Sequence, residues 1–329
     1  MKRVLITGVA GFIGAALAKS LLGRGNTVLG IDNLNDYYDP QLKRDRLATL
    51  TAGQFEFVPV DFSDRAALDA AMKGQQFDTI VHLGAQAGVR YSIENPRAYV
   101  QSNLVGHLEM LELARTRHIP MVYASSSSVY GGNTQLPFRV EDRVDRPLSL
   151  YAATKKSDEL MSETYAHLYR LPLTGLRFFT VYGPWGRPDM AVWMFTDKIL
   201  RGVPIPVFNN GEMRRDFTFI DDIVAGVVAC VDRPPLDDNV AKPGGSVAPH
   251  RIYNIGNNRS ESLMRMIGLI EDACGRKAAL DFQPMQDGDV HETFADVDAI
   301  SSDLGYAPTT PIDEGIPAFV SWFRNYRGL

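Results

Sequence analysis

Residues 5–14 read LITGVAGFIG, in which an apolar run is followed by three glycines at Gly8, Gly11 and Gly14. Glycine allows a tight turn and lets the backbone approach a pyrophosphate, while the helix that follows would offer free N–H groups and the positive end of its dipole. The spacing is GxxGxxG and not the commoner GxGxxG, and a lone glycine motif also fits a plain turn. Whether this is a pyrophosphate-binding loop or a plain turn depends on the residues around it.

An acidic residue follows at the expected place. The next apolar run is TVLGI at residues 27–31. Asp32 follows it directly, at the end of the predicted second strand and 18 positions after Gly14. A carboxylate there can accept hydrogen bonds from both hydroxyls of an adenosine ribose and would repel a 2′-phosphate. Asp32 could also be a helix cap or turn residue, but the order strand, glycine loop, helix, strand and acid favours a dinucleotide site. We therefore expect NAD, and not NADP, as the cofactor.

The chain continues with the same alternation. Apolar, β-rich runs alternate with helical patterns, as in parallel strands that are covered on both faces. The runs lie at 4–7, 27–31, 55–60, 79–85, 120–125 and 173–179, and the helical patterns lie near 11–24, 40–51, 64–73, 97–118 and 151–170. Repeated β-α units predict an α/β fold with a Rossmann-like, doubly wound parallel sheet.

The regular alternation of strand and helix patterns ends after residue 180, where segments rich in Gly, Pro, Asn and Asp predict loops. The stretch from Asp232 to His250 is expected to be an exposed insertion. The C-terminal third mixes short strands and helices, and we interpret it as a smaller α/β lobe that binds substrate. The expected division is a nucleotide-binding domain at 1–180 plus about 218–250, and a substrate lobe at 181–217 and 251–329.

Composition and charge narrow the possible functions. The 329 residues are 45% hydrophobic and 22% charged, with a net charge of −5. No basic face suited to a phosphate backbone is visible, so nucleic acid is not an expected partner. Two cysteines, Cys230 and Cys274, and six scattered histidines form no metal-binding pattern, so we expect no metal. The pattern shows neither a signal peptide nor a membrane span, which favours the cytoplasm and no membrane contact.

Two polar motifs follow the fifth predicted strand. Residues 151–155 read YAATK, so Tyr151 and Lys155 share one face of a helix. A phenol is a poor base at neutral pH, but a nearby ammonium favours the phenolate and makes Tyr151 a usable proton acceptor. The second motif is the serine run in YASSSSVYGGN at 123–133, which could also be an ordinary loop. YxxxK alone is a weak signal, and it gains weight from its place in a nucleotide-binding sheet.

Together these motifs resemble the extended short-chain dehydrogenase/reductase superfamily over nearly the whole chain. The resemblance implies that Ser126 is the third catalytic residue beside Tyr151 and Lys155, and that Lys155 also holds the nicotinamide ribose. Asn103 stands where the family has an asparagine. Asp61 and Phe62 end the third strand, where adenine would lie, and HLGAQAG at 82–88 ends the fourth. The cofactor residues expected are Gly8, Gly11, Phe12, Ile13, Gly14, Asp32, Asn33, Asp61, Phe62, Leu83, Ala85, Gln86, Ala87, Asn103, Ser125, Tyr151, Lys155 and Tyr182.

The serine run also narrows the reaction. Sugar-nucleotide 4,6-dehydratases carry Asp-Glu at the positions of Ser127 and Ser128, and UDP-glucuronate decarboxylases carry Glu at the position of Ser128. This chain has neither carboxylate. The resemblance therefore implies a site that can oxidise and reduce C4 of a sugar but is poorly equipped to eliminate water.

Longer runs indicate the substrate. RFFTVYGPWGRPDMA (177–191), AQAGVRYS (85–92), SLYAATKK (149–156) and MQDGDV (285–290) resemble the UDP-glucuronate 4-epimerase family. UDP-galactose 4-epimerases are less similar, since they have Asn at the position of Thr180 and Arg at that of Gln286. Other UDP-sugar epimerases, a decarboxylase and a non-catalytic NAD-binding regulator are the alternatives, and the last typically loses the Tyr or Lys.

The resemblance implies that Arg215 binds the diphosphate of the substrate and that Asp289 binds its uridine ribose. Arg187, with Thr180 and Ser127, could bind the C6 carboxylate through charge-assisted hydrogen bonds, or it could be a loop arginine paired with Asp189. The substrate residues expected are Arg90, Ser126, Ser127, Ser128, Thr180, Arg187, Arg215, Gln286 and Asp289. The helices near 97–118 and 151–170 pair across a homodimer in this superfamily, so a homodimer is expected on resemblance alone.

Overall fold

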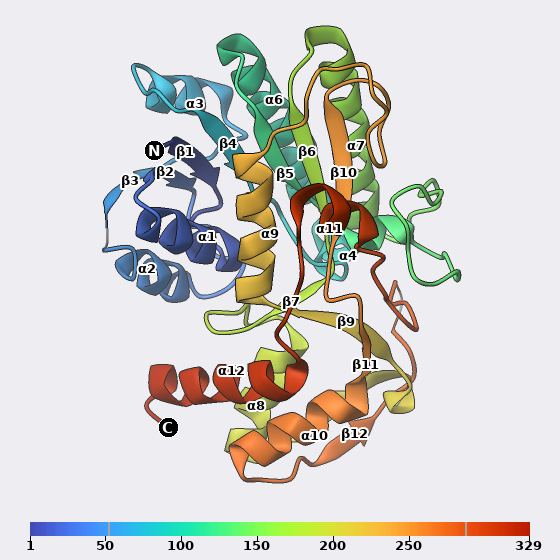
Figure 1. The fold of residues 1–329 in the computed structure, drawn as a ribbon. Coiled ribbons are helices and arrows are strands. Elements are labelled where there is room, and N and C mark those ends of the chain that lie inside the picture. Colours follow the sequence, from blue (N-terminus) through green and yellow to red (C-terminus); the bar gives the residue numbers. More distant parts are fainter. Residues whose placement is uncertain (52, 287) are drawn as a thin grey trace.

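The computed structural model describes residues 1–51, 53–286 and 288–329. Its main feature is a seven-stranded parallel sheet in the order β10-β6-β5-β4-β1-β2-β3 (Figure 1). The strands are β1 (Arg3–Thr7), β2 (Thr27–Asp32), β3 (Gln54–Pro59), β4 (Thr79–His82), β5 (Met121–Ser126), β6 (Leu173–Phe178) and β10 (His250–Ile255). The chain adds β2 and β3 on one side of β1, and then β4, β5, β6 and β10 on the other side. This change of direction at β1 is typical of doubly wound folds. The predicted fold class is confirmed.

Helices cover both faces of this sheet. They are α1 (Phe12–Gly23), α2 (Pro40–Ala48), α3 (Arg65–Met72), α4 (Tyr91–Glu94), α5 (Pro96–Tyr99), α6 (Gly106–Arg117), α7 (Leu150–Tyr169), α9 (Ile220–Asp232) and α11 (Asp298–Leu304). A π-helical segment, η1 (Val100–Val105), joins α5 to α6, and a 3-10 turn, η2 (Ser127–Tyr130), follows β5. The five helical patterns predicted in the first half lie within a few residues of α1, α2, α3, the α5–α6 segment and α7.

Alternation along the strands produces two cores. Val4 and Ile6 of β1 pack in the cluster that contains α1 and α9, whereas Leu5 packs in the cluster that contains α3 and α6. Successive side chains of a strand point to opposite faces, so a run with no polar residue fills both layers. The first cluster continues into the smaller lobe, and the sheet and the lobe therefore share one core.

The smaller lobe lies below the large sheet in Figure 1. It contains a three-stranded sheet in the order β11-β9-β7 and a two-stranded sheet of β12 and β8. Its elements are β7 (Thr180–Tyr182), α8 (Ala191–Arg201), β8 (Ile205–Val207), the 3-10 turn η3 (Phe208–Gly211), β9 (Arg214–Phe219), β11 (Ser260–Ser262), α10 (Leu263–Cys274), β12 (Leu280–Phe282) and α12 (Ile312–Arg327).

The expected domain limits need one adjustment. β10, at His250–Ile255, pairs in parallel with β6 and completes the large sheet, although the sequence assigned residues from 251 onward to the substrate lobe. The reason is that β10 returns to the sheet after the long loop that follows α9. We propose a division in which β10 belongs to the nucleotide-binding domain.

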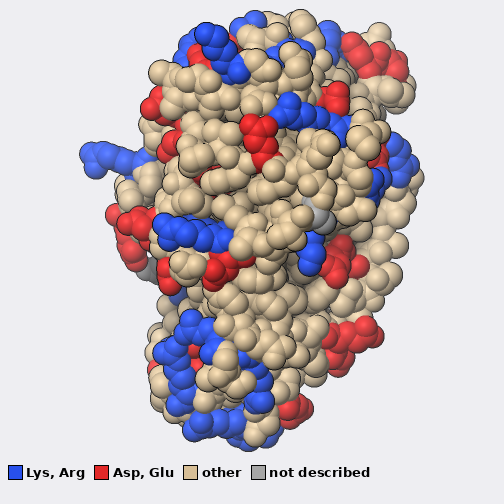
Figure 2. All heavy atoms as spheres, turned by 90° about the vertical axis from the view of Figure 1, so that its left-hand side faces the viewer, with Lys and Arg blue, Asp and Glu red and all other residues tan. Residues whose placement is uncertain are grey.

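The surface carries both signs of charge. On the face shown in Figure 2, acidic and basic side chains are mixed over the upper part, and Lys and Arg predominate at the lower end. In the smaller lobe, Arg201 of α8 and Arg327 of α12 both lie within ion-pair distance of Asp197. Among the helices of the described residues, none combines the length and apolar character needed to cross a membrane.

Candidate active site

The glycine loop between β1 and α1 is built for close backbone contacts. Gly8 has a φ of +68°, and a Cβ at this position would lie 2.8 Å from the backbone of Gly84. A Cβ on Gly14 would lie 2.2 Å from the carbonyl oxygen of Gly8. Both positions therefore require glycine, and the first turn of α1 stays open to a ligand that binds at its N-terminus.

Asp32 lies beside this loop at the end of β2. Its carboxylate accepts hydrogen bonds from the backbone N–H groups of Ala10 (3.2 Å) and Leu34 (2.8 Å). Burial raises the pKa of Asp32, and the positive charge of Lys43 acts in the opposite direction. Asn33 donates to Asp61 (2.9 Å), so the ends of β2 and β3 are joined where the sequence placed an adenosine.

The loop after β4 closes the other side of the glycine loop. The N–H of Gly84 donates to the Thr7 hydroxyl (3.0 Å). Asn103 of η1 accepts from the N–H of Gln86 (2.8 Å) and donates to Thr154 of α7 (3.0 Å). The side-chain amide of Asn103 is therefore engaged in protein hydrogen bonds, and these bonds position the segment that contains Leu83, Ala85, Gln86 and Ala87.

The serine run begins at the end of β5 and turns into η2. The hydroxyl of Ser126 accepts from the N–H of Ser128 (3.2 Å) and lies 3.1 Å from the Ser128 hydroxyl. The Ser125 hydroxyl instead donates to Glu159 (2.7 Å), on the side of the strand that faces α7. The run is therefore a compact turn, and Ser125 contributes to the packing behind it.

Tyr151 and Lys155 occupy the first turns of α7, as the i and i+4 spacing predicts. Ser149 caps this helix by accepting from the N–H of Ala152 (3.1 Å). Lys155 donates to the carbonyl of Ala124 (2.9 Å) and to Asp158 (3.1 Å), and its side chain is only 3% exposed. Lys155 is therefore fixed against β5, immediately before the serine run.

One pocket brings together five residues that the sequence assigned to the substrate. Its lining includes Ser127, Ser128, Thr180, Arg215 and Asp289. They come from η2, β7, β9 and the segment after β12, so the pocket lies where the large sheet meets the smaller lobe. Burial lowers the pKa of Arg215, opposed by Asp289, and its guanidinium donates to the carbonyls of Arg214 (2.8 Å) and His291 (3.2 Å).

Two of the other expected substrate residues, Arg187 and Arg90, lie beside acidic side chains. Arg187 pairs with Asp189, with Nε 3.0 Å from Oδ1, which is the loop-arginine arrangement that the sequence left open. Burial opposes its charge, but Asp189 raises the pKa of Arg187 above its usual value. Arg90 lies 3.8 Å from Asp289. Gln286 has a buried Oε1 without a partner among the described residues, and Asp287 of the MQDGDV run lies outside them.

Comparisons with known proteins identify the family. The family model described as GDP-mannose 4,6 dehydratase matches residues 5–319. Protein CapI of Staphylococcus aureus is 49% identical over 98% of this chain and 99% of its own length. UDP-glucuronate 4-epimerase 6 of Arabidopsis thaliana is 46% identical over 99% of this chain and 72% of its own length. The crystal structure of UDP-glucuronic acid 4-epimerase from Bacillus cereus, in complex with UDP-glucuronic acid and NAD, superposes with a TM-score of 0.86 at 31% identity, covering 98% and 99% of the two chains.

The chain belongs to the UDP-glucuronate 4-epimerase family. Its membership explains why a dehydratase model matches, because the NAD-dependent epimerases and dehydratases share this fold. Ser127 and Ser128 of this epimerase-family chain line the pocket, at the positions where the resemblance implied Asp-Glu for a dehydratase.

Two residues expected at the cofactor site of this epimerase-family chain have side chains in the core. The hydroxyl of Tyr182 is buried without a hydrogen-bond partner among the described residues, and a Cβ on Gly315 of α12 would lie 2.1 Å from it. The ring of Tyr182 packs on Phe217 and Phe219. Phe62 is buried, with the residue 8% exposed. Both side chains therefore contribute to packing, and their contacts with the cofactor stay predictions.

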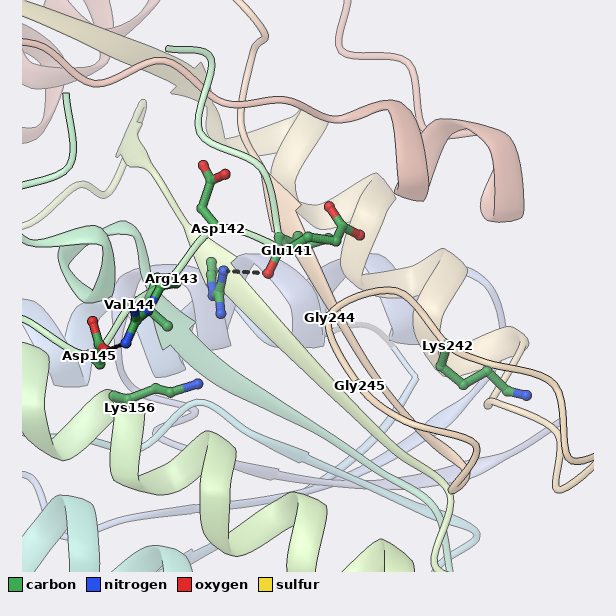
Figure 3. A pocket seen from close by; sticks show the side chains of 11 residues that line it. Glu141, Asp142, Arg143, Val144, Asp145, Lys156, Lys242, Gly244 and Gly245 are labelled. Atoms are coloured by element: carbon green, nitrogen blue, oxygen red, sulfur yellow. Dashed lines mark hydrogen bonds and ion pairs between the residues drawn. The ribbon is translucent and has the colours of Figure 1, made fainter. Parts of the chain in front are cut away.

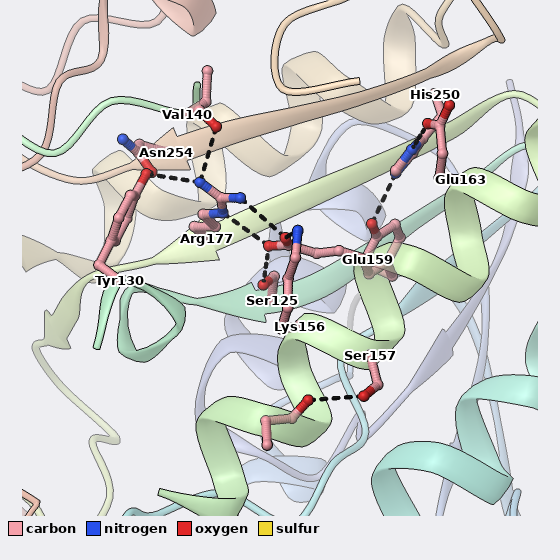
Figure 4. A network of polar contacts seen from close by, with 12 residues as sticks. Ser125, Tyr130, Val140, Lys156, Ser157, Glu159, Glu163, Arg177, His250 and Asn254 are labelled. Carbon is pink, nitrogen blue, oxygen red and sulfur yellow. Dashed lines mark hydrogen bonds and ion pairs between the residues drawn. The ribbon is translucent and has the colours of Figure 1, made fainter. Parts of the chain in front are cut away.

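The epimerase-family chain also contains a buried polar network that the sequence patterns did not reveal (Figure 4). Glu159 of α7 forms two hydrogen bonds with Arg177 of β6, at 2.8 and 3.0 Å. Arg177 also donates to Tyr130 (3.0 Å), which follows the serine run. Burial disfavours the charge of Glu159, but Arg177 keeps its pKa below the usual value. The network joins α7, β6 and the serine run.

A second hollow borders this network at Arg177 (Figure 3). Its lining includes the segment 140–145, Lys156 and Lys242. Several of the charged side chains here are already paired, since Arg143 binds Asp145 (2.5 Å) and Lys156 binds Glu159 (3.1 Å). Mutually neutralised side chains leave no clear preference for a charged ligand, so we assign no ligand to this hollow.

Proposed function

We propose that this chain is an NAD-dependent isomerase that interconverts UDP-glucuronate and UDP-galacturonate at C4. The observation that carries the proposal is the pocket in which Ser127, Ser128 and Thr180 meet Arg215 and Asp289. It combines a cation suited to a diphosphate with small hydroxyl side chains, and the serine run contains no carboxylate that could catalyse elimination. The relatives named above for this activity cover nearly the whole chain.

The cofactor site fits NAD. The glycine loop has no room for a Cβ at Gly8 or Gly14, and Asp32 presents a carboxylate at the end of β2. We infer that the first turn of α1 binds the pyrophosphate and that Asp32 binds the adenosine ribose. When bound, NAD accepts a hydride from C4 and returns it, so none is consumed in a turnover.

The catalytic roles are assigned to three residues. Tyr151 accepts the proton of the C4 hydroxyl during oxidation and returns it during reduction. Lys155, fixed by Ala124 and Asp158, provides the positive charge that favours the phenolate and reaches the nicotinamide ribose. Ser126 holds the reacting hydroxyl by a hydrogen bond.

Arg187 is proposed to bind the C6 carboxylate, together with Thr180 and Ser127. The oxidised sugar is a β-keto acid, which loses CO2 readily when its carboxylate stands perpendicular to the carbonyl plane. An epimerase must hold this group in another orientation while the ring rotates and presents its opposite face. The pairing of Arg187 with Asp189 is compatible with this role, because a substrate carboxylate could share or displace that contact.

The first test is the reaction itself. The purified protein is incubated with UDP-glucuronate and followed by proton NMR, with and without added NAD. Conversion of axial H4 to equatorial H4 at constant mass is expected, whereas a UDP-pentose with CO2 would indicate a decarboxylase. Tyr151→Phe is expected to reduce the rate by about 10²–10⁴, the usual contribution of a general acid–base. UDP-glucose as a second substrate separates a different sugar preference from an inactive protein.

A second test concerns Arg187. Arg187→Ala is expected to weaken UDP-glucuronate binding and to release more CO2 per turnover, because the carboxylate is no longer held. UDP-glucose, which has no carboxylate, serves as the control ligand and should bind about equally well to both proteins. Wild-type affinity together with unchanged CO2 release would remove Arg187 from the carboxylate site.

We also propose that the chain forms a homodimer and works in the cytoplasm. Support for the dimer comes from exposed apolar side chains on the two helices that the resemblance pairs. Leu160 and Leu168 of α7 are 57% and 60% exposed, and Leu108 of α6 is 38% exposed. Apolar side chains repeated along neighbouring helices are typical of a surface covered by another subunit.

A further inference from the structure

Arg46 of α2 is buried without an acidic partner. Its residue is 1% exposed, and among the described residues none of its hydrogen-bond acceptors is a carboxylate. Nη1 donates to the Tyr38 hydroxyl (2.7 Å), and the other bonds go to backbone carbonyls. Burial lowers the pKa of Arg46. A charge in such surroundings is costly unless its hydrogen bonds are well placed.

The carbonyls come from two separate parts of the site. Nη1 donates to Ala10 of the glycine loop (3.2 Å). Nε and Nη2 donate to Trp185 (3.0 and 2.8 Å), and Nη2 also donates to Gly186 (2.9 Å). Trp185 and Gly186 immediately precede Arg187. A single planar guanidinium therefore joins the proposed pyrophosphate loop to the loop that carries the proposed carboxylate ligand.

The glycine loop and the Arg187 loop are each held by further hydrogen bonds that do not involve Arg46. The N–H of Ala10 donates to Asp32 (3.2 Å), so both sides of this residue are fixed. Tyr37, from the same segment as Arg46, donates to Asp189 (3.2 Å), and Asp189 holds Arg187. The segment after β2 thus contacts the Arg187 loop at its backbone and at its side chains.

We propose that Arg46 is a positioning residue that fixes the Arg187 loop relative to the cofactor loop, and thereby controls the fate of the 4-keto acid. The proposal rests on the proposed function. If the Arg187 loop shifts, the C6 carboxylate is no longer held away from the perpendicular orientation. The C5–C6 bond then breaks, its electron pair enters the C4 carbonyl system as an enolate, CO2 leaves, and water supplies a proton to C5. The hydride removed from C4 would then have to return to the 4-ketopentose to complete the turnover.

The test uses Arg46→Lys in the NAD-loaded protein, because lysine keeps the charge but cannot span both loops. UDP-glucuronate labelled with carbon-13 at C6 is converted, and the ratio of released CO2 to UDP-galacturonate is measured. We expect this ratio to rise about tenfold or more, in line with the effect of small displacements at reacting groups. A role in stability alone would lower the melting temperature and leave the ratio unchanged.

Arg251→Lys is the matched control. Arg251 is 7% exposed and donates to the carbonyl of Arg233 and to Thr174 (3.2 Å), in a part of β10 that does not contact either loop. It is expected to leave the ratio unchanged. Tyr37→Phe removes only the bond to Asp189 and should raise the ratio by a smaller factor, which gives a second route if Arg46→Lys does not fold. An unchanged ratio in the folded Arg46→Lys protein, or in Tyr37→Phe when that is the folded variant, would overturn the proposal.

Hydrogen exchange separates this proposal from the proposed function. Backbone amides at 183–190 are expected to exchange faster in NAD-loaded Arg46→Lys than in the wild type or in Arg251→Lys. This readout needs no turnover. If the wild type has no epimerase activity, the proposed function fails while the exchange still tests the link between the loops. Equal exchange in all three proteins would contradict that link.

Discussion

At the residue scale, the polar side chains buried under the site are held in specific protonation states. His82 lies 2.7 Å from the Thr7 hydroxyl, and burial together with Lys155 lowers its pKa to about 3. His107 lies 2.9 Å from the Ser162 hydroxyl, and burial lowers its pKa well below the usual value, with His82 adding to the effect. Both rings are therefore neutral in the folded protein at physiological pH.

These histidines predict a loss of stability in acid. Below about pH 6.5 the unfolded chain binds protons at these positions and the folded chain does not, so the free energy of unfolding falls as pH decreases. Each histidine contributes about 1.4 kcal/mol per pH unit to this slope. His107→Gln is expected to reduce the slope between about pH 6 and 4 by that amount, measured by urea unfolding at several pH values. An identical slope in the two proteins would show that His107 is protonated when folded.

At the element scale, α7 carries two of the proposed catalytic residues together with a buried ion pair that holds the helix in place. It presents Tyr151 and Lys155 at its first turns and Glu159 one turn later, where the bond to Arg177 ties it to β6 (Figure 4). Both side chains of this ion pair are almost completely buried, at 1% and 2% exposure. Such a pair is sensitive to the loss of one partner, because the remaining charge has no access to water.

A double-mutant cycle tests this pair. Glu159→Met leaves the Arg177 guanidinium without its counter-charge and is expected to lower the free energy of unfolding by about 3–5 kcal/mol, and Arg177→Met is the other single change. Replacing both residues by methionine is expected to cost less than the sum of the two single changes, because no buried charge remains. Urea unfolding of the wild type, both single variants and the double variant gives the coupling. Additive costs would mean that the two side chains stabilise the fold independently.

The sequence predicted the sheet better than it predicted the contacts of the site. Several of the parallel strands are largely apolar runs, and the glycine motif and Asp32 directly follow the first two of them, so both signals can be recognised in short stretches of sequence. Arg46 has no such signal in the sequence, because most of its acceptors are backbone carbonyls up to 140 positions away and any residue supplies a carbonyl. The burial of the Tyr182 hydroxyl likewise depends on Gly315, which reaches it only through the folding of α12.

At the scale of the whole molecule, the proposed dimer would place α6 and α7 between two subunits. We expect Leu160→Glu combined with Leu168→Glu to shift the protein from dimer to monomer in sedimentation velocity, because two charges would be buried in an apolar contact. Leu236→Glu is the control, since Leu236 is 69% exposed in the loop after α9 and lies outside these helices. A wild type that sediments as a monomer would contradict the dimer, and so would a variant that remains dimeric.

The order of the elements along the chain has a consequence for synthesis. Trp185 and Trp193 pack against Trp322 of α12, with ring centroids 5.1 and 5.6 Å apart. α12 begins at Ile312, 93 positions after β9 ends at Phe219. At about 5–20 residues per second, the ribosome needs roughly 5–20 s to supply this partner. During that interval the growing chain exposes an aromatic surface, which makes the unfinished lobe a natural target for chaperones that bind apolar segments.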